Sequence, residues 1–345
     1  MYSVTMPQSQ PMVSVCTTTY NAEPYIRQTM DGVLMQKTDF SFDYVIADDA
    51  SQDRTADLIR DYAERYPEII RFRRNEKNMG LNANFMQTML ECRGKYIALL
   101  DGDDYWTDPN KLQLQVDFME SHQECVFCST ASQVYHQDSN ELVHGHPELP
   151  IDDDSVRYFG IEEMYQPFLF WIPTHSILLR REYVEFPAWF IDAVFVDRAL
   201  RLILTLKGNA AYINRTTCVY RKHGSNVSKN ITYQTIRRYA ELYRNVYLYS
   251  GKQYYKTARG AINETIYAER LSIRKELHGW KKLQALCSNT LFAFREFRLI
   301  SLKDILRFPY HFLFAGDFAD WFIKLSGCQA TTTSTSHNLN DTLNK

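Results

Sequence analysis

The chain has 345 residues, of which 45% are hydrophobic, so it can bury one large core or two smaller ones. Its formal net charge of -2 at pH 7 excludes a polyanion-binding role for the chain as a whole, and no nucleic acid partner is expected. The charge is uneven, because residues 229–307 hold 16 Lys and Arg against 6 Asp and Glu. Any basic surface therefore lies in the C-terminal third.

Seven cysteines without a regular spacing are more typical of a reducing compartment than of a secreted disulfide scaffold, and we expect a cytoplasmic protein. Cys125 and Cys128 form a CxxC pair, but the strand-like stretch around them predicts core positions rather than metal ligands. The first residues lack the pattern of a signal peptide, and no apolar run reaches the length of a membrane span. Any membrane contact is expected to be peripheral, at the inner face.

From residue 12 onward, apolar β-branched stretches alternate with segments of helical spacing. We expect strands at 12–19, 42–49, 69–75 and 95–101, and helices at 24–36, 53–66 and 81–93. This alternation predicts an α/β fold with a mostly parallel central sheet flanked by helices. Ligands bind outside the carboxyl ends of the strands in such sheets, so the candidate site is located before any motif is considered.

The middle of the chain is less regular, and the C-terminal part changes character. We expect helices at 111–121 and 197–208, strands at 125–136, 175–181 and 211–223, and a surface excursion at 137–155. From residue 233 the composition is helical, with breaks at Gly251 and Gly279. The polar, low-complexity end of the chain, residues 328–345, is expected to be disordered.

Three expected strands end in polar motifs, which read "CTTTYN", "IADDAS" and "LLDGDD". Hydroxyls and five acids therefore converge on one edge of the sheet, where the carboxylates repel one another unless a cation is bound. Oxygen donors with few His or Cys neighbours favour Mg²⁺ or Mn²⁺ over zinc. Because Mg²⁺ usually lies between carboxylates and substrate phosphates, the motifs indicate a nucleotide diphosphate ligand.

The segments "PMVSVCTTTYNAEPYIRQTMDGVLMQ", "DYVIADDASQDRTADLI" and "RNEKNMGLNANFMQTMLECRGKYIALLDGDDYWTDPNKLQLQVDFM" together resemble the family 2 glycosyltransferases, which have the GT-A fold. The resemblance is strong over 11–119 and weaker from there to 228. It implies a GT-A catalytic domain at 11–228, with a nucleotide-binding half at 11–119 and an acceptor half at 120–228. A helical C-terminal module at 229–327 lies beyond it.

The resemblance implies a role for each residue that matches a family motif. Thr18 and Tyr20 would flank the nucleobase, and Asp49 would accept a hydrogen bond from its imide N–H, which favours uracil. Asp101 would bind the ribose hydroxyls. Asn78 and Gly80, in "NMGLNANF", would form a loop that approaches the donor closely.

In the same way, Asp103 would coordinate the metal ion between the two phosphates, with Asp104 assisting or contacting the sugar. Arg221 and His223, in "VYRKHGSN", would lie in a loop that closes over the diphosphate. Inverting members use a carboxylate to take the proton of the acceptor hydroxyl. Asp192 and Asp197 are both candidates, and Asp197 is favoured because it opens a helix, although Val196 departs from the family pattern and Asp197 could instead be only a helix N-cap.

The resemblance therefore predicts an inverting, metal-dependent glycosyltransferase that uses a UDP-sugar and a glycan or lipid-linked acceptor, in bacterial surface polysaccharide or glycolipid synthesis. An aspartyl phosphatase would carry its DxD motif on the first strand, and a sugar nucleotidyltransferase would need a Gly-rich basic loop there. A catalytically inactive nucleotide-sugar binder or assembly protein stays open.

Two interpretations are open for the role of the basic, aromatic C-terminal helices. They could lie at the surface of an anionic membrane, or pack against the catalytic domain or a second subunit of a homo-oligomer.

Overall fold

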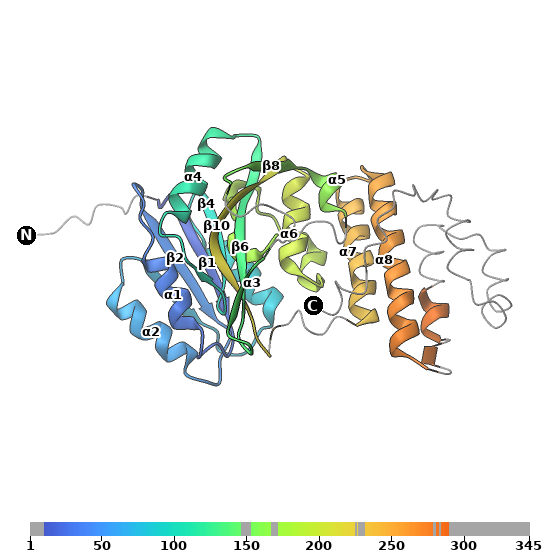
Figure 1. Ribbon diagram of the computed structural model, residues 1–345, viewed down its shortest axis with the longest axis horizontal. Helices are drawn as coiled ribbons and strands as arrows, with labels where there is room; N and C mark the ends of the chain where they lie inside the picture. Colours follow the sequence, from blue (N-terminus) through green and yellow to red (C-terminus); the bar gives the residue numbers. More distant parts are fainter. Residues whose placement is uncertain are drawn as a thin grey trace, which may run out of the picture. The chain divides into compact units, whose positions relative to one another are not determined.

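The computed structural model describes residues 10–145, 153–166, 172–224, 226, 232–278, 281–282 and 284–289 (Figure 1). The chain divides into two compact units, residues 1–265 and 266–345. Every feature of the candidate site lies in the first unit, which contains the whole central sheet.

Ten strands of the described residues form one sheet in the order β3-β2-β1-β4-β9-β6-β10-β5, with β7 paired to β6 and β8 paired to β10. Their bounds are β1 Val13–Thr19, β2 Phe42–Asp48, β3 Ile70–Arg74, β4 Tyr96–Asp101, β5 Tyr105–Trp106, β6 Cys125–His136, β7 Glu141–His144, β8 Val156–Phe159, β9 Leu178–Arg180 and β10 Asn209–Lys222. Strands β3, β2, β1 and β4 are mutually parallel, whereas parallel and antiparallel pairs mix beyond β4. The α/β fold with a central sheet is confirmed.

Helices connect the strands as the sequence pattern predicts. Their bounds are α1 Ile26–Leu34, α2 Thr55–Arg65, α3 Leu81–Glu91, α4 Lys111–Ser121, α5 Ile161–Met164, α6 Val196–Thr205, α7 Tyr233–Tyr249 and α8 Tyr255–Glu276, with short 3₁₀ helices η1 Thr174–Ser176, η2 Arg181–Tyr183 and η3 Ala188–Asp192. Right-handed crossovers place α1 and α2 on one face of the parallel half and α3 on the other. In agreement, α1 packs beside α2, whereas α3 packs on β1 and β2.

The order of connections reverses between β1 and β4. The chain passes outward from β1 through β2 to β3, and then returns through α3 to β4 on the other side of β1. In open α/β sheets the ligand site lies at the carboxyl edge of such a switch point. Asp101 and Thr19 end these two strands, so the predicted motifs meet there.

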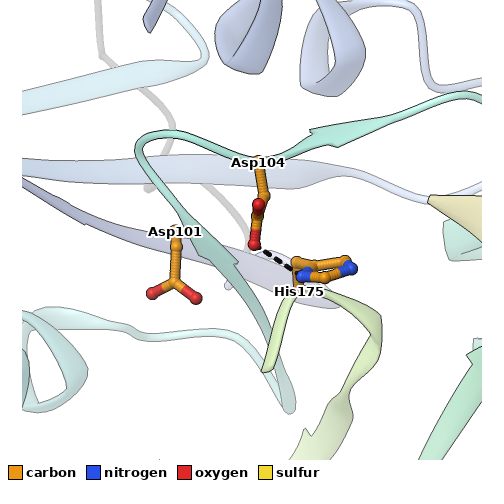
Figure 2. Close-up of side chains that lie close together, drawn as sticks. All are labelled: Asp101, Asp104 and His175. Atoms are coloured by element: carbon orange, nitrogen blue, oxygen red, sulfur yellow. Dashed lines mark ion pairs between the residues drawn. The ribbon is translucent and has the colours of Figure 1, made fainter. Parts of the chain in front are cut away.

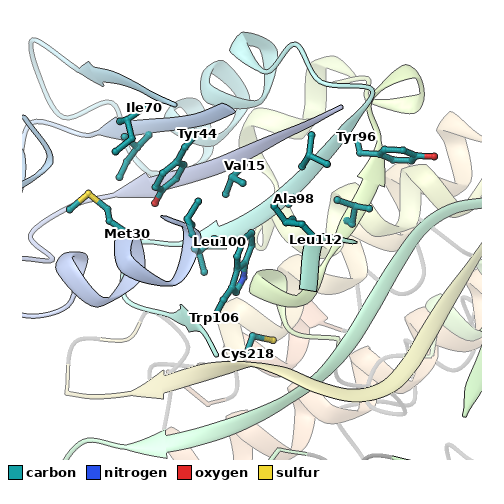
Figure 3. Close-up of a cluster of buried hydrophobic side chains, with 14 of the residues drawn as sticks. Val15, Met30, Tyr44, Ile70, Tyr96, Ala98, Leu100, Trp106, Leu112 and Cys218 are labelled. Carbon is teal, nitrogen blue, oxygen red and sulfur yellow. The ribbon is translucent and has the colours of Figure 1, made fainter. Parts of the chain in front are cut away.

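The core of this half lies between the parallel strands and α1, α2 and α4 (Figure 3). Strand β1 is buried along its whole length, because it has a strand on each side and helices on both faces. Helix α1 buries Ile26, Met30 and Val33, which share one face at helical spacing. Cys125 and Cys128 are buried members of the same cluster, so their prediction as core residues is confirmed.

Two predictions about the later segments can be compared with the structure. The expected surface position of 137–155 is confirmed for residues 137–142, which are exposed, although part of the segment forms β7, which pairs with β6. Residues 146–152 lie outside the described residues. The expected break at Gly251 is confirmed between α7 and α8, where Gly251 has a φ of 70°. Gly279 and the tail at 328–345 lie outside the described residues, as does the part of the helical C-terminal module from residue 290 onward.

None of the helices in the described ranges is both long enough and apolar enough to span a bilayer.

A lysine is buried in the core beside the candidate site. Lys111 is fully buried at the start of α4, where its ammonium group donates to the Gln115 side chain and to the Ser176 carbonyl at 3.2 Å. The ammonium lies 5.1 Å from the centre of the Trp106 ring. Loss of hydration lowers the pKa of Lys111 from 10.5 to about 8. Charging this side chain in the folded state therefore costs stability.

We expect Lys111→Met to raise the free energy of unfolding at pH 7 by up to about 3 kcal/mol, because 1.36 kcal/mol corresponds to each unit of pKa difference. The lost hydrogen bonds offset part of this gain. The folded pKa lies below the unfolded one, so the wild type binds fewer protons when folded and gains stability as the pH rises from about 8 to 10.5. Urea unfolding of both proteins at pH 7, 9 and 10 should show the difference shrinking. A stability difference that stays the same at all three pH values would contradict a buried lysine with a lowered pKa.

Candidate active site

The strand register brings the predicted motifs together at the switch point. Thr18 on β1 lies opposite Asp101 on β4, and Thr19 lies opposite Asp48 on β2. Thr18 is buried, whereas the ring of Tyr20, just beyond the strand, is 46% exposed. The edge therefore presents an accessible aromatic ring beside a row of acids.

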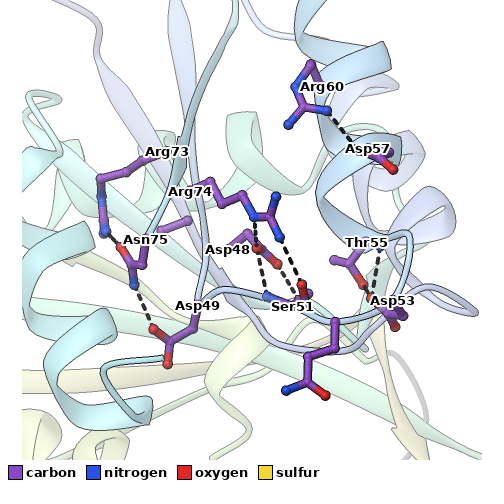
Figure 4. Close-up of polar contacts among 12 residues, drawn as sticks. Asp48, Asp49, Ser51, Asp53, Thr55, Asp57, Arg60, Arg73, Arg74 and Asn75 are labelled. Atoms are coloured by element: carbon purple, nitrogen blue, oxygen red, sulfur yellow. Dashed lines mark hydrogen bonds and ion pairs between the residues drawn. The ribbon is translucent and has the colours of Figure 1, made fainter. Parts of the chain in front are cut away.

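Asp48, the first acid of the "IADDAS" motif, stabilises the loop that follows β2 (Figure 4). Asp48 is fully buried and accepts hydrogen bonds from the backbone N–H and the hydroxyl of Ser51, while the Arg74 guanidinium lies 3.5 Å away. Ala50, between them, has a φ of 60°, a conformation that this local hydrogen bonding supports. The carboxylate of Asp48 is thus used within the protein, as expected for a structural residue.

Side chains of the same loop hold the loop that follows β1. The Ser51 hydroxyl accepts from the Asn21 N–H at 2.8 Å, and the Thr55 hydroxyl accepts from the Ala22 N–H at 2.8 Å. Asp53 accepts from the Glu23 N–H at 3.1 Å. The motif "DDASQDRT" therefore also positions the residues next to Tyr20.

Asp49 fixes the loop that leads into α3. Its carboxylate is buried and accepts from the Asn75 side chain at 2.7 Å, from the Met79 N–H at 2.8 Å and from the Gly80 N–H at 2.9 Å. Gly80 has a φ of 82°, which favours glycine, and it also receives support from the Asn78 side-chain oxygen at 3.0 Å. The structure thus brings together Asp49, Asn78 and Gly80, three residues that the resemblance assigns to binding of the sugar donor.

The "DGDD" turn after β4 brings three carboxylates close together. Burial, and then the charges of Asp104 and Asp103, raise the pKa of Asp101 well above its usual range. Burial and the charge of Asp103 likewise raise the pKa of Asp104, although the Arg221 backbone N–H opposes this. The charge of Asp197 also contributes to the raised pKa of Asp101.

Asp104 is 1% exposed, its carboxylate points at the His175 ring (Figure 2), and hydrogen bonds hold both of its oxygens. Oδ2 lies 2.6 Å from Nδ1 of His175, and Oδ1 accepts from the Arg221 backbone N–H at 2.8 Å. On its other side the His175 ring contacts the Ser132 hydroxyl through Nε2 at 2.8 Å. Asp104 is therefore anchored to both η1 and β10.

Asp103 is the more accessible of the two neighbouring acids, with 30% of its side chain exposed. Its Oδ2 lies 3.0 Å from Nε2 of His223 and 3.4 Å from the Asn226 amide. The His223 ring packs against Tyr25, with 4.5 Å between the ring centres. The predicted diphosphate residue His223 is thus beside the predicted metal ligand.

Arg221 is buried, and its guanidinium is engaged within the protein. It donates to the Asp103 carbonyl at 2.9 Å and to the side chains of Gln28 and Gln137. Three aromatic rings surround it within 5.6 Å, those of Tyr25, Tyr105 and Tyr135. This geometry favours a role in positioning the turn over direct contact with a ligand.

Asp197 lies in the first turn of α6 with 26% of its side chain exposed. The residue before the helix is Phe195, so Asp197 is not the N-cap. The Arg201 guanidinium, one turn further on, pairs with its Oδ2 at 2.6 Å and orients it. The other candidate, Asp192, is exposed at the end of η3.

The donor atoms at this edge suit a hard divalent cation. One ligand atom each from Asp101, Asp104 and His175 lies within 4.8 Å of the others. Carboxylate oxygens are preferred by Mg²⁺ and Mn²⁺, and the raised pKa values show that the uncompensated cluster favours protonation, which a cation would reverse. Because the ring of His175 is hydrogen-bonded to the buried Asp104, it fits a layer of residues behind the accessible carboxylates.

Sequence reasoning missed His175 and Ser132. The segment "PTHSILLRR" predicts a strand, and a lone His in it carries no signal. Contact with Asp104 depends on the packing of η1 against β4 and β6, which sequence spacing does not reveal.

The glycosyl transferase family 2 model matches residues 14–185. The chain is 34% identical over 222 residues to the uncharacterized protein Rv1520 of Mycobacterium tuberculosis, covering 62% of this chain and 60% of that protein. It is 35% identical over 147 residues to TuaG of Bacillus subtilis, whose name provisionally assigns it to teichuronic acid biosynthesis, covering 42% of this chain and 57% of TuaG. The chain thus spans well under two thirds of the length of these relatives.

Among solved structures, Staphylococcus aureus TarS in complex with UDP-GlcNAc aligns with 85% of this chain and 77% of its own, at 16% identity and a TM-score of 0.49. At these values the likeness carries no functional argument.

The turn has no room for a side chain at Gly102. A Cβ there would lie 2.5 Å from the Thr19 hydroxyl oxygen and 2.6 Å from its Cβ. We expect Gly102→Ala to displace the turn and to lower kcat/KM by about 10²-fold, the scale of an ångström-level misplacement. Gly260→Ala, in α8 and away from the site, is the matched control, because nothing lies within 4 Å of its Cβ. Equal activity of the two variants, measured on folded protein, would contradict the close approach.

Proposed function

Because the chain belongs to glycosyltransferase family 2, we propose that it transfers a sugar, with inversion, from a nucleotide diphosphate sugar to an acceptor hydroxyl. One observation carries the proposal. Asp101, Asp103 and Asp104 lie together at the switch point of the sheet, where an uncompensated cluster of charge calls for a cation and a phosphate ligand.

The donor nucleotide is a uridine diphosphate in this proposal. Tyr20 offers an exposed ring for stacking on the base, with Thr18 beside it. Asp49 holds the loop of Asn78 and Gly80 through two backbone N–H groups and is the candidate acceptor for the base imide. Asp101 would accept from the ribose hydroxyls.

Asp103 would hold Mn²⁺ or Mg²⁺, since its carboxylate is more accessible than that of Asp104. Asp104 would hold the turn in place behind Asp103. The metal, when bound, neutralises the charge of the leaving diphosphate. His223 lies 3.0 Å from Asp103 and could contact the same phosphates. Arg221 would keep the turn in place through the Asp103 carbonyl.

Asp197 would act as the general base. The acceptor oxygen attacks the anomeric carbon, the bond from that carbon to the diphosphate oxygen breaks, and the hydroxyl proton passes to Asp197. Arg201 orients this carboxylate through a 2.6 Å contact. TuaG's name motivates a role in bacterial surface polysaccharide synthesis, with a glycan or lipid-linked acceptor.

We expect Asp103→Asn to weaken Mn²⁺-dependent binding of UDP by more than about 100-fold, above the range for loss of an outer-shell contact. Asp108→Asn removes a carboxylate that pairs with Arg215 outside the site, and it should bind like the wild type. Calorimetry of the wild type and both variants with UDP, GDP and TDP, in the presence of Mn²⁺, checks the metal role and the base preference together. Tighter binding of GDP or TDP by the wild type would refute the uridine assignment, and unchanged UDP binding by Asp103→Asn would refute the metal assignment.

A separate measurement tests whether the protein is an enzyme or an inactive nucleotide-sugar binder. We expect Asp197→Asn to lower kcat by about 10²–10⁴-fold, the usual contribution of a general base, while UDP binding is kept. Asp192→Asn is the matched control, because Asp192 is the rival candidate on the neighbouring 3₁₀ helix. A large loss in Asp192→Asn alone would reverse the assignment, and no turnover by the wild type with any donor would favour the binder.

A further inference from the structure

A continuous line of buried polar side chains runs behind the acid cluster. Ser132 on β6, His175 on η1 and Asp104 after β4 are each less than 5% exposed. The Ser132 hydroxyl lies 2.8 Å from Nε2 of His175, and Nδ1 of His175 lies 2.6 Å from Oδ2 of Asp104. Figure 2 shows the Asp104 carboxylate pointing at the His175 ring, with Asp101 alongside.

We propose that His175, held by Ser132, is a positioning residue that fixes the orientation of the Asp104 carboxylate. Through Asp104 it would also fix the turn that presents Asp103 to the metal ion. The inference rests on the proposed function, because it assigns a residue to the metal and nucleotide site put forward there. Neither His175 nor Ser132 would touch the nucleotide, the sugar or the reacting atoms.

The first argument is the cost of burying these groups. A buried carboxylate is tolerated only when it is paired or hydrogen-bonded, and Asp104 has two such anchors, His175 and the backbone N–H of Arg221. Removing the imidazole would leave Oδ2 without its 2.6 Å donor. Asp104 would then be free to rotate, and the adjacent Asp103 would lose a fixed neighbour.

The second argument is that the imidazole plane is itself held from several sides. The Trp106 indole N–H donates to the His175 carbonyl at 2.8 Å and fixes the backbone. The Tyr220 ring lies nearly parallel to the imidazole, at 7°, with 6.0 Å between centres. A histidine needed only to fill space would not require a partner on each ring nitrogen. Oriented second-layer residues of this kind tune metal sites.

A hydrolytic role for the same three residues is excluded by their burial. Their order of contacts is that of a Ser-His-Asp triad, but Ser132 is only 4% exposed, and its hydroxyl also lies 2.9 Å from the Gln133 carbonyl. No substrate carbonyl could reach this oxygen. The arrangement therefore serves Asp104.

Two substitutions at one position separate positioning from packing. His175→Leu keeps most of the volume but removes both nitrogens, whereas His175→Asn keeps a donor near the place of Nδ1. Ser176→Ala is the matched control, because it removes a buried hydroxyl from the same turn, bonded to the Pro173 carbonyl at 2.7 Å, without touching Asp104. Ser132→Ala tests the outer member of the line.

The readout is Mn²⁺ affinity in the presence of UDP, measured from the electron paramagnetic resonance signal of free Mn²⁺, together with the melting temperature. We expect His175→Leu to weaken Mn²⁺ binding by about 10–100-fold, the scale of an outer-shell loss, and Ser132→Ala to weaken it less. His175→Asn should recover most of the affinity, and Ser176→Ala should bind like the wild type.

The inference is overturned if His175→Leu melts at a lower temperature but binds Mn²⁺ like the wild type, or if His175→Asn and His175→Leu are equally impaired. Should His175→Leu fail to fold, wild-type Mn²⁺ affinity in Ser132→Ala would overturn it, and a selective loss there would support it. A wild type without Mn²⁺-dependent UDP binding would instead refute the proposed function.

Discussion

The structure of the site depends on the repulsion among carboxylates at the end of β4. Burial and mutual charge raise the pKa values of Asp101 and Asp104, and donors hold both oxygens of Asp104 in place. Those donors come from distant parts of the chain. His175 belongs to η1, and Arg221 belongs to the end of β10. The elements beyond β4 therefore provide the hydrogen-bond donors for an acid that follows one of the parallel strands.

The acids at this edge divide into two groups according to their contacts. Asp48, Asp49 and Asp104 are buried and accept hydrogen bonds from loop amides or side chains of the protein. Asp103 and Asp197 are 30% and 26% exposed, and each has one oriented basic neighbour. Hydrogen bonds within the protein hold the carboxylates of the buried group, whereas the carboxylates of Asp103 and Asp197 keep part of their surface accessible. A motif written as a row of identical aspartates thus contains residues with different physical tasks.

The sequence predicted the alternating first half well, because period and turn residues are local signals, and β6 was predicted with its observed bounds. The short strands β7 and β8 were missed, since four-residue segments carry little periodic signal and their pairing with β6 and β10 is a tertiary effect. The strand-end acids were found, but the partners of Asp104 were not. His175 reaches it only because η1 packs beside β4, and the ring of aromatic side chains around Arg221 is equally non-local.

The loop after β1 and the loop after β2 hold each other through bonds of one kind, in which a side chain accepts from a backbone amide. Ser51, Asp53 and Thr55 accept from the amides of residues 21 to 23, and the side chains of Asn21 and Glu23 accept from the amides of Gln52 and Arg54. A backbone amide is the same whichever side chain its residue carries, proline excepted. Selection on these contacts therefore acts in both loops, at the residues whose side chains accept. Gln52 and Arg54 are exposed and contribute through their amides, so they can diverge in evolution without disturbing the frame. A rigid edge can in this way carry variable positions between its fixed ones.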